Sequence, residues 1–299
     1  MRTRKSTKSS VSITHSIDEC IAIEKGLKSI HINKLIKSKD TVVIVPNWVN
    51  YKKPDPKDAV VVGQNSLRTI IEIVKSSNPK NIIVATGSDG DKTSKVMKKV
   101  GYKRIIDETE AKFIDLNYGP YFEISLNNKR PSSTEINKII ELATVIISFT
   151  PLKHHEESTM SGSITNIALG LPPAEIHGYP KKNLGIHEDL HGFITAMAER
   201  IAIDISIVSC DPVMIGKGPS NGIARHANLV ICGTDPVATD TVAARLLGFK
   251  PQAIQYLFNC GKLNIGETDL EKIDIKGIGI KKAEGIFSQN VYGEEIVID

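Results

Sequence analysis

Five short runs rich in Ile and Val, separated by segments of helical period, constrain the fold of this chain more than any other feature. Polar or turn residues bound each run, as is typical of buried strands. The predicted strands cover residues 41–45, 81–86, 144–149, 204–209 and 228–232, and a shorter run at 11–14 is a candidate for one more. Continuous apolar runs favour parallel strands that are covered on both faces.

Apolar residues at helical spacing occupy the segments between these runs. They predict helices over residues 17–37, 58–76, 133–142, 188–203 and 236–247. Alternating strands and helices predict an α/β fold: a mostly parallel sheet with helices on both faces. The chain has 299 residues, of which 40% are hydrophobic, enough for a substantial core. We expect residues 16–299 to form one α/β domain with a small β-rich insertion at about 107–130.

The charge pattern argues against several classes of partner. Residues 1–15 start with a basic, Ser-rich stretch and are expected to form a disordered tail. Elsewhere acids and bases are interspersed, the net charge is only +4 and aromatics make up 5%, so a nucleic-acid partner is not expected. The apolar runs at 42–45 and 144–147 are far too short to span a bilayer. We therefore expect a cytoplasmic protein without a membrane partner.

The cysteines exclude one class of cofactor site by local motif. Cys20, Cys210, Cys232 and Cys260 are all more than four residues apart. The CxxC spacing of zinc and iron–sulfur sites is therefore missing.

Polar residues follow the predicted strands. In an open parallel sheet these positions share one edge, where ligands bind. The residues expected on that side are Asn47, Lys153, His154, His155, Asp211 and Asp235. For Asp235, which precedes Pro236, ordinary helix capping is the stronger explanation.

Two positions carry the strongest chemical signals. Imidazoles move protons or bind metals near neutral pH, and a desolvated lysine has a lowered pKa, so Lys153, His154 and His155 form a candidate catalytic cluster. Both histidines would converge only if this stretch were a loop, and a solvated loop without function is the alternative. Asp240 falls on a helix that is apolar nearly all round, where a carboxylate needs a cation or several hydrogen bonds. A structural role for Asp240 is equally open.

Two Gly-rich turns are weaker candidates for anion binding. One contains Lys217 and Gly218 but lacks the P-loop and dinucleotide patterns. The other precedes Asn166 and reads equally well as a capped helix start.

An ordered set of motifs resembles the domain-of-unknown-function 362 family over residues 40–275. The most specific is Asp235-Pro236-Val237-Ala238-Thr239-Asp240. The family's other motifs are matched by Pro46-Asn47, by Pro151-Leu152-Lys153-His154-His155, by Asn166, by Asp211, by Gly218-Pro219 and by Leu247-Gly248-Phe249. Val45 and Thr165 stand where the family has lysines, which implies a different or weaker anionic ligand. Many relatives carry a ferredoxin-like iron–sulfur module, and this chain has no such cysteine set.

The leading functional hypothesis is an enzyme acting on a small anionic metabolite, with or without a divalent metal. Lys153, His154, His155 and Asp211 would be catalytic. Asn47, Asn166, Lys217 and Gly218 would bind the ligand, and a metal would be held by Asp240, Asp211 and His155. The alternative is a non-catalytic metal- or cofactor-binding module or a redox partner. The sequence gives no substrate, metal identity or oligomeric state.

Overall fold

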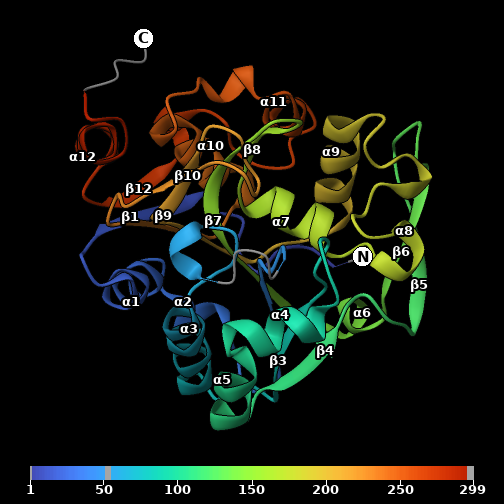
Figure 1. Cartoon of the computed structure of the whole chain (residues 1–299). Coiled ribbons are helices and arrows are strands. Elements are labelled where there is room, and N and C mark those ends of the chain that lie inside the picture. The colour runs from blue at the N-terminus through green and yellow to red at the C-terminus, as the bar shows by residue number, and fades with distance from the viewer. Residues whose placement is uncertain (1, 51–54, 295–299) are drawn as a thin grey trace.

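A computed structural model describes residues 2–50 and 55–294 of the chain. A large twisted sheet runs through the molecule with helices on both faces (Figure 1). Its strand order is β12 (Asp274–Gly277), β1 (Ser10–His15), β11 (Leu229–Gly233), β9 (Ile205–Ile215), β7 (Val145–His155), β2 (Thr41–Pro46), β3 (Asn81–Thr86) and β4 (Lys112–Asp115), with β10 (Ile223–Arg225) beside β9 and β8 (Thr159–Ser161) beside β7.

Two apolar cores lie on opposite faces of the sheet, because side chains of successive strand residues point to opposite sides. The first face carries α1 (Glu19–Ser29), α2 (Ile32–Leu35), α3 (Gln64–Ser76), α4 (Thr93–Val100) and α5 (Tyr102–Thr109). The second carries α7 (Ser163–Gly170), α9 (Leu190–Arg200), α10 (Pro236–Leu246), α11 (Gln255–Lys262) and α12 (Ile280–Tyr292). The predicted α/β class, with a mostly parallel sheet between two helical layers, is therefore confirmed.

Short elements complete the chain. They are α6 (Ile139–Leu142), α8 (Ala174–His177) and the 3-10 turns η1 (Pro56–Asp58), η2 (Asn183–Gly185), η3 (Pro251–Ala253) and η4 (Leu270–Lys272). No helix in the described ranges is both long and apolar enough to cross a bilayer.

Strand direction differs from the expectation at one important place. The run from β9 through β7, β2 and β3 to β4 is parallel, but β11 is antiparallel to β9. Cys232 therefore pairs with Ile207, at the amino-terminal half of β9. Asp235, which follows β11, lies at the opposite edge from the residues that follow the parallel strands, so its predicted place near Lys153 was wrong.

The predicted helix over residues 133–142 was also wrong in its first half. Residues 133–137 form β6 (Ser133–Asn137), which pairs with β5 (Tyr121–Ser125) in a separate two-stranded sheet. Thr134 and Ile136 are buried while Glu135 between them is exposed, a period of two that favours a strand. The predicted insertion at 107–130 is therefore not one unit. Its first strand, β4, is the edge strand of the main sheet, and its second, β5, pairs with β6, which lies after residue 130.

The amino-terminal residues are ordered against the molecule, contrary to the predicted tail over 1–15. Residues 10–15 form β1, inside the sheet between β11 and β12. The basic residues before it bind buried carboxylates: Arg2 pairs with Asp204 at 2.5 Å, Arg4 with Asp235 at 2.8 Å and Lys5 with Asp40 at 2.8 Å. Complementary charge, which composition alone did not reveal, holds this segment in place.

Candidate functional site

The carboxyl ends of β2, β3 and β7 surround a small cavity of about 50 Å³, the inner cavity. The polar side chains that line it are Asn47, Thr86, Asp89, Lys153, His155, Ser161, Thr165 and Asn166. A hollow of about 380 Å³, the outer cavity, shares Val49, Asp89, His155, Leu169 and Pro219 with it and adds Glu157, Lys181, Lys182 and His187. Together they form one cleft at the strand ends, where open α/β sheets bind ligands.

Lys153 is fully buried at the inner end of this cleft. Its Nζ donates to Asn47 Oδ1 at 2.9 Å and to the Val60 carbonyl at 3.3 Å. Burial lowers the pKa of Lys153 to about 7, while the negative charge of Asp89 acts in the opposite direction. At neutral pH this side chain is therefore divided between the amine and the ammonium form.

A chain of amides fixes the partner of Lys153. Asn166 Nδ2 donates to the Val45 carbonyl at 2.9 Å and to Ser148 Oγ at 3.0 Å. Its Oδ1 accepts from Asn47 Nδ2 at 3.2 Å, which leaves Asn47 Oδ1 for Lys153. The structure thus brings the predicted residues Asn47, Lys153 and Asn166 together.

A second buried lysine, Lys181, was not predicted. Its Nζ donates to the carbonyls of Gly87 at 3.0 Å, Gly170 at 3.0 Å and Leu169 at 3.4 Å. Burial lowers the pKa of Lys181 to about 8, against the opposite effect of Asp89 and Asp115. Three acceptors match the three N–H groups of an ammonium ion, so Lys181 supplies a fixed positive charge to the cleft.

Asp89, in the loop that follows β3, is the acidic residue common to both cavities. Burial raises its pKa, and the positive charges of Lys181 and Lys153 lower it. Its Oδ1 is buried and has no hydrogen-bond partner among the described residues. A buried acceptor without a partner is costly, which makes Asp89 a candidate for direct contact with a ligand.

His155 lies beside Lys153 on the same face of the strand. The backbone N–H groups of Glu157 and Ser158 both donate to its Nδ1 at 3.1 Å. A nitrogen that accepts these bonds carries no proton, so the neutral ring has its proton on Nε2. Burial lowers the pKa of His155 to about 4, which keeps the ring neutral at pH 7. His155 can therefore donate a hydrogen bond to a ligand through Nε2.

His154 faces the other side, because residues 153–155 are strand rather than loop. Its Nδ1 accepts from the Gly216 N–H at 3.0 Å, and its ring contacts Phe249. Its Nε2 lies 3.4 Å from the Tyr292 hydroxyl. The structure does not bring His154 to the cavities.

Asp211 lines a different cavity, of about 680 Å³, together with Glu19, Ser209 and His226. Its Oδ1 lies 2.6 Å from Nδ1 of His226. Glu19 there accepts a hydrogen bond from Ser66, and burial raises the pKa of Glu19 to about 6. The predicted convergence of Asp211 with Lys153 was therefore wrong: Asp211 follows the buried part of β9 but turns to the α1 side.

Asp240 has a structural role at the start of α7. Its two carboxylate oxygens accept from the backbone N–H groups of Ser163 at 2.7 Å and Ile164 at 3.0 Å. A Cβ on Gly162 would lie 2.5 Å from Asp240 Oδ1, so only glycine permits this approach. Burial raises the pKa of Asp240 to about 7, against the lowering effect of the two N–H groups. Asp240 therefore binds backbone amides, which is the structural alternative to metal binding.

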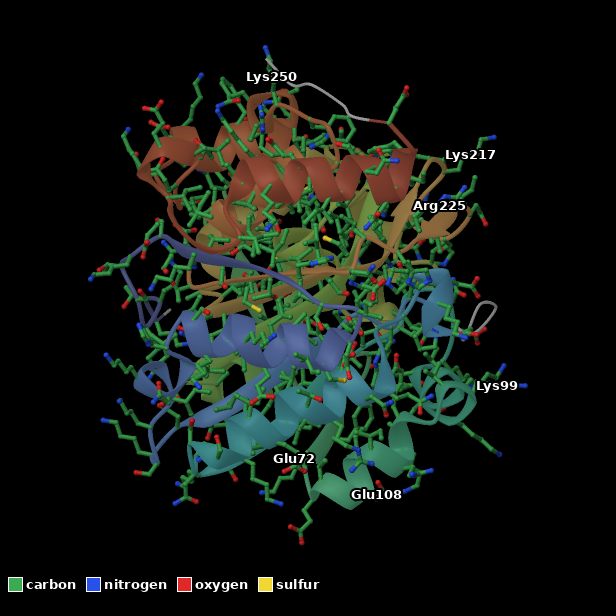
Figure 2. All side chains as sticks on the ribbon, turned by 90° about the vertical axis from the view of Figure 1, so that its left-hand side faces the viewer. Glu72, Lys99, Glu108, Lys217, Arg225 and Lys250 are labelled. Atoms are coloured by element: carbon green, nitrogen blue, oxygen red, sulfur yellow. The ribbon has the colours of Figure 1, made fainter. Side chains whose placement is uncertain are left out.

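Lys217 and Gly218, in the Gly-rich turn over residues 216–222, do not line either cavity. Lys217 is exposed, and Figure 2 shows it pointing away from the molecule near Arg225. Gly218 packs against the backbone of His154 and its carbonyl accepts from the Glu156 N–H at 3.1 Å. Pro219 lines both cavities, and Ser220 and Asn221 line the outer one.

The predicted metal set is not assembled. His155, Asp211 and Asp240 lie in three different environments, as described above. Within residues 2–50 and 55–294, no group of three or more His, Cys, Asp or Glu side chains is arranged to hold a metal ion. The separation follows from the helix-capping role of Asp240 and the turn of Asp211 toward α1.

Two residues of this cleft, Asp89 and Lys181, were not predicted from the sequence, for different reasons. Asp89 follows a correctly predicted strand, so the rule that selected Asn47 and Lys153 could have found it. Lys181 lies in a long loop without periodicity, and nothing in its neighbourhood of the sequence distinguishes it from the adjacent, exposed Lys182.

Comparisons with known proteins address the family and the fold. No curated protein sequence matches the chain. Among solved structures, the lactate racemase apoprotein from Thermoanaerobacterium thermosaccharolyticum is similar, with a TM-score of 0.49 and 13% sequence identity. The similarity covers 82% of this chain and 58% of that one, so the chain spans less than two thirds of that structure's length. The model of the family described as Domain of unknown function (DUF362) matches residues 21–245, which is most of the chain, and this protein therefore belongs to that family.

Proposed function

We propose that this protein is an enzyme that binds a small anionic metabolite in the cleft formed by the inner and outer cavities. The observation that carries the proposal is the burial of Lys153 and Lys181 at the strand ends. Neither lysine has a carboxylate within salt-bridge distance among the described residues, and both donate to carbonyl oxygens instead.

The charge balance of this cleft favours an anion. A buried ammonium group is costly unless an opposite charge compensates it. Asp89 and, for Lys181, Asp115 are the nearby acids, and burial raises the pKa of both, which disfavours their charged forms. Glu157, at the rim, is already bound to Lys182 at 2.7 Å and to His187. An anionic ligand would supply the missing negative charge.

The polar groups around Lys153 suit an enzyme better than a passive binding module. Lys153 exchanges a proton near pH 7, which is where a general acid or base is most effective. His155 offers an N–H donor, and Asp89 offers an oxygen without a partner. Three groups of different proton affinity thus line one small space.

A thermal-shift titration with acetate, glycolate, glyoxylate, pyruvate and phosphate tests binding at this site. A ligand at about 100 times its Kd stabilises the native state by about 2.7 kcal/mol. We expect Lys153→Met and Lys181→Met each to weaken binding of the stabilising anion by about tenfold or more. The first change removes a hydrogen-bond donor that lines the inner cavity, and the second removes a buried positive charge beside the outer one.

Lys217→Met is the matched control, because it removes an exposed lysine that lies outside both cavities. It should bind with the affinity of the unchanged protein. If Lys153→Met, Lys181→Met and Lys217→Met all bind the anion with the affinity of the unchanged protein, the cleft is not the anion site. If only Lys217→Met weakens binding, the anion binds at the Gly-rich turn instead.

A further inference from the structure

We propose that Lys153 is a nucleophile that forms an imine with a small terminal carbonyl group of the ligand. This inference rests on the proposed function, because it assigns a reaction to the same cleft. It narrows the ligand class from small anions to small anionic aldehydes and 2-oxo acids.

The hydrogen bonds of Lys153 fit a neutral amine. An amine has two N–H groups and one lone pair, whereas an ammonium ion has three N–H groups. Lys153 has two acceptors, Asn47 Oδ1 and the Val60 carbonyl. When both N–H groups are so used, the lone pair remains free to attack a carbon atom.

Lys181 provides the contrast within the same cleft. Its three carbonyl acceptors take all three protons of an ammonium ion and leave no lone pair. Two buried lysines are therefore specialised in different ways: Lys181 is held as a cation and Lys153 as a nucleophile. Desolvation, which lowers the pKa of Lys153 to about 7, is a recognised way of activating a lysine.

The shape of the cleft restricts the reacting end of the ligand. Lys153 lines the inner cavity of about 50 Å³ and not the outer one of about 380 Å³. The inner cavity has room for about one or two water-sized groups, so only a slender end of a ligand fits it. An aldehyde or a short 2-oxo acid has its carbonyl at such an end, while a larger body would occupy the outer cavity beside Lys181.

The reaction balances without an oxidant or reductant. The Lys153 lone pair forms a bond to the carbonyl carbon, and the C=O π electrons move to oxygen. The nitrogen loses one proton and the oxygen gains one, which gives a carbinolamine. A second proton then reaches this oxygen, the C–O bond breaks, and water leaves as the C=N bond forms and nitrogen loses its last proton.

Asp89 is placed to carry these protons. It lines the inner cavity with Lys153, and its unpartnered Oδ1 accepts a proton from nitrogen in one step and returns it to oxygen in the next. Burial raises the pKa of Asp89, which favours uptake of a proton by this carboxylate.

Reductive trapping tests the inference on the full-length protein. Glyoxylate or pyruvate is added at pH 7 with cyanoborohydride, and the modified lysine is mapped by mass spectrometry. We expect one adduct, at Lys153, formed about tenfold or more faster than at any surface lysine. With a pKa of about 7, Lys153 is partly in the amine form at this pH, whereas an exposed lysine is almost entirely protonated. Lys153→Met and Lys153→Arg should lose the adduct, and Lys217→Met should retain it.

Glycolate and acetate separate failure of this inference from failure of the proposed function. If they or the oxo acids stabilise the protein but no adduct forms at Lys153, the imine is refuted and anion binding stands. If adducts are spread evenly over surface lysines, the imine is likewise refuted. If none of these anions stabilises the protein and none is trapped, both proposals fail for this ligand class.

Discussion

At the scale of single residues, hydrogen-bond acceptors decide what a buried lysine does. Lys153 and Lys181 have the same side chain and lie in the same cleft, and burial lowers the pKa of both. Two acceptors leave Lys153 with a free lone pair as an amine, while three hold Lys181 as a cation. The difference comes from the acceptors of Lys181, which are the carbonyls of Gly87, just after β3, and of Leu169 and Gly170 at the end of α7.

The lowered pKa of Lys153 has a measurable effect on stability. Between pH 7 and 10 the unfolded chain binds a proton that the folded protein releases. The free energy of unfolding should therefore rise with pH in this window, by up to about 1.4 kcal/mol per pH unit. Below pH 7 both states are protonated and this contribution is constant.

Urea unfolding of the unchanged protein and of Lys153→Met at pH 7, 8 and 9 checks this expectation. Between pH 7 and pH 9, the free energy of unfolding of the unchanged protein should increase by about 2 kcal/mol relative to that of Lys153→Met. Lys217→Met, as the control, should follow the pH dependence of the unchanged protein. Parallel curves for the unchanged protein and Lys153→Met would show that Lys153 titrates like an ordinary lysine.

At the scale of elements, the length of β7 decides which of the two adjacent histidines, His154 or His155, faces the cleft. The strand continues from its buried run through His155, so alternation turns Lys153 and His155 to one face and His154 to the other. A loop at this position would have allowed both histidines to reach one ligand. The pairing of Lys153 with Ser161 and of His155 with Thr159 of β8 keeps the stretch extended.

Alanine variants of the two histidines separate their roles. His155→Ala should weaken binding of the stabilising anion by about fivefold to tenfold, the loss of one hydrogen bond. His154→Ala should leave this affinity unchanged but lower the free energy of unfolding by about 1–2 kcal/mol, because it loses the Gly216 hydrogen bond and the Phe249 contact. Calorimetric titration and urea unfolding measure the two effects, and weaker binding by His154→Ala would place that residue in the site after all.

At the scale of the whole molecule, one sheet with helices on both faces (Figure 1) separates two apolar cores. The cleft lies where the parallel strands of this sheet end. The central strands β7 and β9 are buried along most of their length between these cores. The β5–β6 pair forms a separate two-stranded sheet, and in β5 only Ile124 is buried. Such isolated pairs are marginal by themselves.

Hydrogen exchange should reproduce this hierarchy. Amides of β7 and β9, such as those of Ile147 and Ile207, should exchange only on global unfolding. Amides of β5 (Tyr121–Ser125) should exchange about tenfold or more faster, because that sheet can open locally. Exchange followed by mass spectrometry at peptide resolution gives the comparison, and uniform protection across both sheets would contradict it.

The sequence by itself determined the buried strands, most of the helices and the family, because these depend on the period of apolar residues and on short contiguous motifs. It also predicted that Asn47, Lys153 and His155 lie near one another, because residues that follow parallel strands share an edge. It selected Asn166 in a different way, from a Gly-rich turn and a family motif. Only the tertiary structure decided the direction of β11, the capping role of Asp240 and the ordering of the amino-terminal segment by Asp204, Asp40 and Asp235. These features depend on partners far away in the chain, whose amides and charges leave no local pattern in the sequence. The same is true of Asn47 and Val60, the two acceptors of Lys153.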